Sequence, residues 1–80
     1  MDSTVICVHT GKITITLPAD AEDGQEYWLT SANNNVMSVA VESSQHSIYP
    51  SDKTSFNDSS WHIYIFDAYN KKWRYGNLNK

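Results

Sequence analysis

Alternation of apolar and polar residues is the clearest pattern along the chain. From Lys12 to Leu17 every second residue is apolar, and the residues between are lysine and threonine. A period of two places all the apolar side chains on one face of an extended strand. The pattern recurs from Val36 to Glu42 and, with aromatic residues, from Ser60 to Asp67. These three segments predict β-strands.

Three less regular segments complete the predicted strands. Thr4 to Val8 is a β-branched run, Gln25 to Thr30 carries two aromatic residues, and Lys72 to Tyr75 closes the pattern. Thr10-Gly11 separates the first run from the Lys12 strand, which predicts a hairpin between the two.

Turn residues divide these strands. They are Pro18, the acidic segment 19–24, Asn33 to Asn35, Pro50 to Asp52, and Ala68 to Lys71. The acidic segment is long enough for one helical turn that ends at Gly24. Residues 43–60 are polar, with apolar anchors only at Ile48, Tyr49 and Phe56. No long helical stripe occurs. We therefore expect one all-β domain over residues 1–80, a compact antiparallel sandwich, barrel or prism of six to eight short strands with at most one short helical turn.

Composition excludes several classes of protein. Ser, Thr and Asn make up 23 of the 80 residues, charged residues 19% and aromatic residues 12%, which is unlike a disordered chain. A single cysteine, Cys7, forms no disulfide scaffold. No apolar run approaches the roughly 18 residues of a membrane helix, and residues 1–8 do not resemble a secretory signal. A net charge of −3 argues against nucleic-acid binding.

Small size favours oligomerisation. A chain of this length buries only about 60% of its unfolded surface when it folds alone. The segment Ser60 to Asp67 is partly apolar on both faces, so we expect one face to fill the core and the other to meet a neighbouring subunit. The expected subunit-interface residues are Trp61, His62, Tyr64 and Phe66.

The chain contains residues that could bind a metal or act as a nucleophile, but they do not form a known motif. Cys7, His9, His46 and His62 could supply a zinc site, or one histidine from each of three chains could meet on a threefold axis, but their spacing matches no zinc motif. The simpler explanation is a small buried thiol and hydrogen-bonded histidines. A Cys–His nucleophile lacks a glycine-rich elbow. We expect no cofactor, no metal and no enzymatic activity.

Two charged segments have alternative readings. A cation could be bound by Asp20, Glu22, Asp23 and Glu26, but the simpler interpretation of this segment is a solvated turn. The run Lys71 to Tyr75 interleaves basic and aromatic residues. It fits a closing strand with aromatic residues in the core, a partner contact, or a platform for a sugar or base. The candidate partner- or glycan-binding residues are Tyr69, Trp73, Arg74 and Tyr75.

One pattern spans residues 12–76. It consists of the strand Lys12 to Leu17 ended by Pro18, then Asp23-Gly24-Gln25 and an aromatic strand, then Asn34-Asn35-Val36 and a further strand, and finally Ile48 and Trp73. In this order the chain resembles the small β modules of bacteriophage tail fibres and tailspikes.

The resemblance implies a non-enzymatic virion structural protein that forms homotrimers and is assembled in the host cytoplasm. Such a module caps a fibre or binds other virion proteins or a host-surface receptor. A stand-alone capsid decoration subunit or an excised fragment is also compatible. The alternative hypothesis is a small phage-encoded acidic inhibitor that binds a host protein through residues 20–26.

Overall fold

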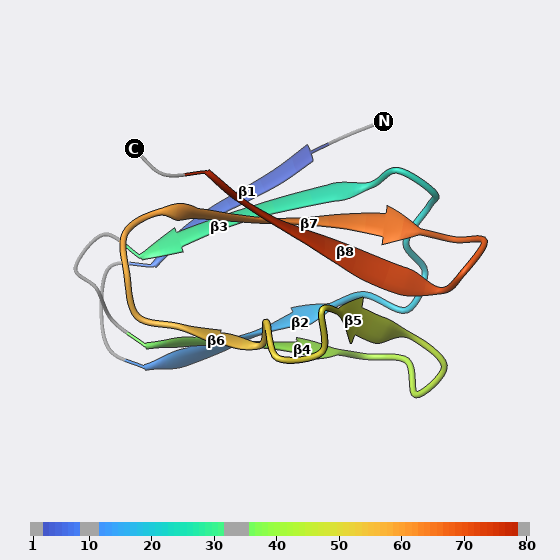
Figure 1. Ribbon diagram of the computed structural model, residues 1–80, viewed down its shortest axis with the longest axis horizontal. Helices are drawn as coiled ribbons and strands as arrows, with labels where there is room; N and C mark the ends of the chain where they lie inside the picture. Colours follow the sequence, from blue (N-terminus) through green and yellow to red (C-terminus); the bar gives the residue numbers. More distant parts are fainter. Residues whose placement is uncertain (1–2, 9–11, 32–35, 79–80) are drawn as a thin grey trace.

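The computed structural model describes residues 3–8, 12–31 and 36–78, which form a two-layer β-sandwich (Figure 1). Its strands are β1 (Ser3–Val8), β2 (Ile13–Leu17), β3 (Glu26–Ser31), β4 (Met37–Val41), β5 (Ser47–Tyr49), β6 (Ser55–Phe56), β7 (Trp61–Asp67) and β8 (Lys72–Leu78). The expected all-β sandwich is confirmed. No membrane-spanning helix is found in the described part of the chain.

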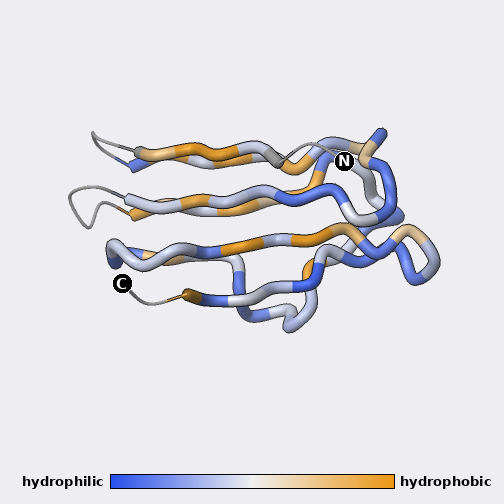
Figure 2. Tube along the Cα trace, turned by 90° about the horizontal axis from the view of Figure 1, so that it is seen from above, coloured by the Kyte–Doolittle hydropathy of each residue, from blue (hydrophilic) through white to orange (hydrophobic). Residues whose placement is uncertain are grey.

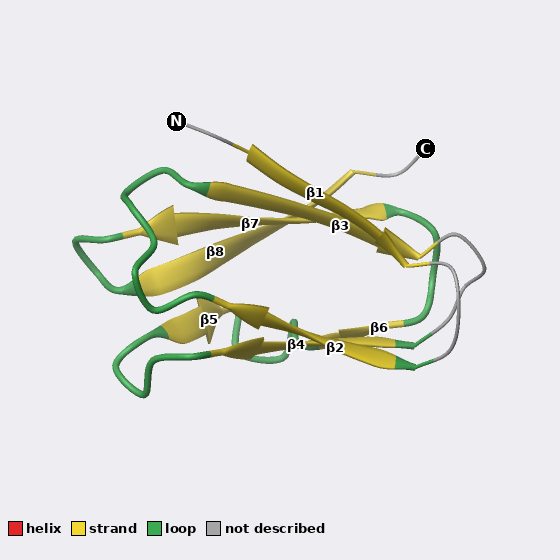
Figure 3. Cartoon of the chain, turned by 180° about the vertical axis from the view of Figure 1, so that it is seen from behind, coloured by secondary structure: helices red, strands yellow, loops and turns green. Residues whose placement is uncertain are grey.

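The chain changes sheet at every connection from β1 to β7. The larger sheet has the order β1-β3-β7-β8-β5 and the smaller β2-β4-β6, and only the last connection, from β7 to β8, is a hairpin within one sheet (Figure 3). Among the neighbours that the chain reaches after two crossings, β1 runs parallel to β3 and β2 runs parallel to β4, whereas β6 runs antiparallel to β4. The pair β5 and β8 is parallel as well. The sheets are therefore mixed rather than purely antiparallel.

The predicted hairpin between the first two strands is wrong, because β1 and β2 belong to different sheets. A short connection can turn within a sheet or cross to the facing one, and both paths keep the period of two. The crossing lets Ile6 of β1 and Ile15 of β2 approach one core from opposite sides.

The core lies between the inner faces of the two sheets. Its buried members are Ile15, Leu17, Leu29, Met37, Val39, Ile48, Tyr64, Phe66 and Trp73. In β2 and β4 the alternation of the sequence is reproduced, since Leu17 and Met37 are buried while Thr14, Thr16 and Ala40 are exposed. Figure 2 shows apolar segments in both layers.

β7 has one covered face and one uncovered face. His62, Tyr64 and Phe66 point into the sandwich and are at most 4% exposed. Trp61, Ile63 and Ile65 point outward from the larger sheet, and Ile65 is 41% exposed. The two apolar faces expected from the sequence are both present, but only one is packed within the protomer.

The segment without a clear pattern contains the two shortest strands, β5 and β6. The expected turn at Pro50 to Asp52 lies between them. Gly24 has the expected positive φ, 84°, and its N–H donates to the Phe66 carbonyl at 2.8 Å. The acidic segment before it forms turns without a helix. The predicted turn at 33–35 lies outside the described residues.

Candidate functional site

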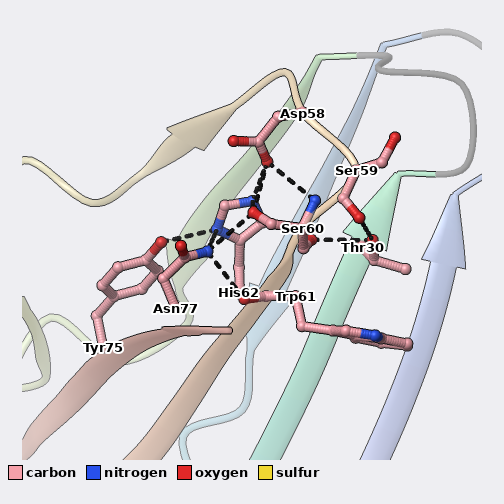
Figure 4. A network of polar contacts seen from close by, with 8 residues as sticks. All are labelled: Thr30, Asp58, Ser59, Ser60, Trp61, His62, Tyr75 and Asn77. Atoms are coloured by element: carbon pink, nitrogen blue, oxygen red, sulfur yellow. Dashed lines mark hydrogen bonds and ion pairs between the residues drawn. The ribbon is translucent and has the colours of Figure 1, made fainter. Parts of the chain in front are cut away.

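His62 lies at the centre of a polar network at one end of the sandwich (Figure 4). The members of this His62 network are Thr30, Asp58, Ser60, His62, Tyr75 and Asn77. Asp58 and Ser60 precede β7, and the Ser60 N–H donates to the Asp58 carboxylate at 3.3 Å. This local turn, typical of aspartate, places the carboxylate within hydrogen-bond distance of Nε2 of His62, four residues later.

The hydrogen bonds of the network converge on Asp58. A carboxylate only accepts, so His62 Nε2 donates to Asp58 Oδ1 at 2.7 Å, and Ser60 Oγ donates to the same oxygen at 2.9 Å. In the neutral ring His62 Nδ1 is then an acceptor, and the Tyr75 hydroxyl donates to it at 2.7 Å. Asn77 Nδ2 donates to Ser60 Oγ at 2.9 Å. The network thus joins β8, β7 and the loop before β7.

Ring stacking ties this network to the smaller sheet. The Phe56 ring of β6 lies 3.7 Å from the His62 ring at an angle of 18° and 5.4 Å from the Tyr75 ring at 10°. Thr30 Oγ1 adds a hydrogen bond to the Ser60 carbonyl at 2.9 Å. The network therefore closes one end of the sandwich by joining both sheets and the loop between them.

The chain Tyr75–His62–Asp58 has the order of a proton relay, but its environment does not support nucleophilic chemistry. Burial is the main cause that raises the pKa of the Tyr75 hydroxyl, and the nearby charge of Asp58 raises it further. The raised pKa disfavours the phenolate. No cavity forms among the described residues where a substrate could meet this hydroxyl. Through its hydrogen bonds and stacked rings the network joins β6, β7 and β8, and in this sense it is a structural latch.

Acid should weaken this latch. The hydrogen bond from His62 lowers the pKa of Asp58 below its ordinary value, against a smaller opposing effect of burial. A carboxyl with a lowered folded-state pKa contributes stability above its unfolded pKa of about 4 and loses it as the pH falls through the folded value. When the pH is lowered from 5 to 2, the melting temperature of Asp58→Asn should therefore fall by less than that of the wild type. Asp52→Asn, in the exposed turn after β5, is the control; a wild-type-like slope for Asp58→Asn would contradict the assignment.

The outward face of the larger sheet carries a second feature, an apolar patch. We call it the outer patch; it comprises Val5, Trp28, Trp61, Ile63, Ile65 and Leu78. Strand register aligns Val5, Trp28 and Ile63 in one row across three strands. Trp28 and Trp61 meet edge to face at 6.0 Å. Val5 is 64% exposed and Leu78 51%, so the patch is open to solvent at its margins.

The predicted interface residues need a correction. His62, Tyr64 and Phe66 are buried inside the protomer, so these side chains have no surface to offer to another subunit. Of the four residues, only Trp61 lies on the outward face. Alternation alone separates two faces of a strand but does not say which one points inward. Here the inward face is the one whose polar side-chain atoms form hydrogen bonds inside the protomer. The Tyr64 hydroxyl, for example, donates to the Lys53 carbonyl.

The predicted partner- or glycan-binding residues are not brought together. Trp73 is fully buried, which leaves no ring face for a sugar, and Tyr75 stacks on Phe56. Tyr69 is 92% exposed in the β7–β8 turn. Arg74 points outward and pairs with Asp67 at 3.2 Å. The closing-strand interpretation therefore describes Trp73 and Tyr75 better than a binding platform does.

Two outward-facing aromatic positions are not identified by the sequence analysis. Tyr49 is 54% exposed and its ring lies 5.6 Å from the Arg74 guanidinium and 5.8 Å from the Lys72 ammonium. Trp28 belongs to the outer patch, and its indole N–H donates to Glu26 at 2.9 Å. Trp28 alternates with inward Tyr27 and Leu29, and this period could have identified it as outward-facing.

The metal hypothesis gains no support. His62 is occupied by the network, Cys7 is exposed on β1, and His9 lies outside the described residues. No group of three potential ligands occurs in the described ranges. In the acidic segment, Asp23 accepts the Ala68 N–H at 3.0 Å, so part of this segment serves the fold.

Comparison of the chain with protein-family models, curated proteins and solved structures finds no match. The resemblance to phage fibre modules thus rests on the sequence pattern alone.

Proposed function

We propose that the protein is a non-enzymatic structural subunit that assembles through the outer patch. The observation that carries the proposal is the contrast between the two outward faces of the sandwich. The smaller sheet presents Thr14, Thr16 and Ser38, whereas the larger sheet presents two tryptophans and two isoleucines. A contiguous apolar face on a small protein is typical of an interaction surface.

The shape of the outer patch also suits contact with another sheet. Gly76 lies beside Ile63 in the register, and a Cβ at Gly76 would meet no atom within 4 Å. Glycine is therefore not demanded by packing within the protomer, and its lack of a side chain leaves Ile63 accessible. Charges stand at the margin, where Glu26 and Arg74 flank Ile65. An apolar centre with a polar rim is the usual anatomy of a protein interface.

The resemblance to tail-fibre modules supports three copies as the number of subunits and the virion as the location. In such an assembly the outer patches of three protomers would face a common axis, and the polar faces of the smaller sheets would remain in solvent. Mass spectrometry of purified phage particles tests the location, since a virion component must be present in them. Detection only in infected cells would favour the inhibitor instead.

A charge in the outer patch should abolish this contact. Ile65→Glu places a carboxylate at the patch between Arg74 and Glu26, and the monomer can tolerate it because this position is 41% exposed to water. Desolvating that carboxylate in an apolar contact is costly. Light scattering should show a threefold lower mass than for the wild type, while Ala40→Glu on the smaller sheet should leave the mass unchanged. Equal masses for both variants and the wild type would overturn assembly through the outer patch.

A further inference from the structure

One side of the sandwich ends in two unpaired strand edges, one above the other. Within the described residues β1 pairs only with β3, and β2 pairs only with β4. Figures 1 and 2 show that these two edge strands lie over each other on the same side of the molecule. We propose that this side pairs with the same side of a second copy of the chain, through a two-fold axis that extends both sheets at once.

The two sides of the sandwich differ in how their edges are protected. Proteins blunt free edges with charges, proline, bulges or very short strands, because an open edge is a template for another strand. On the opposite side the edge strands are β5, of three residues, and β6, of two residues. β1 and β2 are longer, with six and five residues, and neither contains a charge, glycine or proline, although Lys12 precedes β2 and Pro18 follows it. The longer and less protected edges are therefore confined to one side.

The geometry of the two edges indicates which partner can bind them. An unpaired edge offers main-chain N–H and C=O groups, which an extended strand satisfies. Here a partner must bring two such strands, separated by the spacing of two packed sheets, about 10 Å. A second copy presents this pair of edges. A two-fold axis perpendicular to both sheets would make β1 antiparallel to its copy and β2 antiparallel to its copy in one contact.

The same axis joins the apolar surfaces of the two copies. Residues directly opposite in an antiparallel pair share a face, so with the axis at Val5 that residue lies opposite its own copy. The row Ile63, Trp28, Val5 then continues into the second protomer. No like charges meet within β1 or β2, and threonine pairs across β2 are favourable. Because the opposite edges are too short to propagate pairing, the contact closes as a pair and does not form fibres.

The edge contact is separate from the outer-patch contact, and both together give six copies. A double variant, Thr14→Lys with Thr16→Lys, lines the β2 edge with positive charge without touching the outer patch. Its matched control is Ser38→Lys with Ala40→Lys, on the paired positions of β4, one strand away from the edge. We expect the edge variant to reduce the mass twofold, from six copies to three, and the control to leave six.

The masses separate the two proposals. A wild-type mass of three copies overturns the edge contact and keeps the outer-patch contact, a mass of two does the reverse, and a mass of one overturns both. Hydrogen exchange of the wild-type protein gives a readout without any substitution. Protection of consecutive β1 amides, including those that face away from β3, supports the pairing. Fast exchange of every second β1 amide at the concentration of full assembly contradicts it.

Discussion

Replacing Trp73 with alanine is expected to lower the free energy of unfolding by about 3–5 kcal/mol. Trp73 is fully buried and packs against Phe66, at 4.9 Å between ring centroids, and against the edge of Tyr27 at 5.6 Å. A domain of this length has about 4–12 kcal/mol of stability in total. The melting temperature should therefore fall by more than about 12 °C.

Two further variants show why the loss occurs. Trp73 Nε1 has no hydrogen-bond partner among the described residues, so Trp73→Phe gives up volume without a polar bond and should cost well under half as much. Tyr69→Ala, at a position 92% exposed, should leave the melting temperature within about 2 °C. A small effect of Trp73→Ala on melting, together with loss of binding to a glycan array, would instead restore the sugar-platform hypothesis.

The sequence predicted the positions of strands wherever side-chain alternation carried the signal. β2 and β4 alternate strictly because one face of the smaller sheet meets the core and the other meets solvent. Their burial follows the pattern residue by residue. β5 and β6 gave no such signal, since two or three residues are too few for a period. They are held as strands by neighbours distant in the sequence, Lys72–Arg74 and Met37–Ser38.

The sequence could not predict the path between strands. Thr10-Gly11 indicates a change of direction, but the choice between a hairpin and a crossing depends on which sheet covers the next apolar face. Tertiary packing decides between the two paths, because Ile6 and Ile15 both reach the core only when β1 and β2 lie in facing sheets. The parallel pairs β1–β3 and β2–β4 follow from this choice and have no local signature.

The candidate sites show the same limit. The sequence identified the two faces of β7 but assigned the interface to the inward one. The His62 network also went unnoticed, because Tyr75 and Asn77 reach His62 only through the β7–β8 hairpin register. The spacing of Asp58, Ser60 and His62, two residues apart, was the available local signal. It gains meaning only once these residues are placed on one turn before β7.

Replacing His62 with alanine is the second large expected effect, a loss of about 3 kcal/mol. The substitution removes a buried ring, its stacking on Phe56 and the two 2.7 Å hydrogen bonds to Asp58 and Tyr75. Asp58 can turn to water because its side chain is 61% exposed, whereas the Tyr75 hydroxyl is part-buried and loses its acceptor. The melting temperature should fall by about 12–24 °C.

A double-mutant cycle with Tyr75→Phe isolates the hydrogen bond from the packing. If the network acts as a latch, Tyr75→Phe alone costs about 1 kcal/mol, and in the His62→Ala background it costs nothing or becomes favourable, because the hydroxyl there is already without its acceptor. Additive losses would mean that His62 contributes only volume. The cycle thus decides whether the end of the sandwich is held by a directed chain of hydrogen bonds, from Tyr75 through His62 to Asp58, or by the contact of three stacked rings.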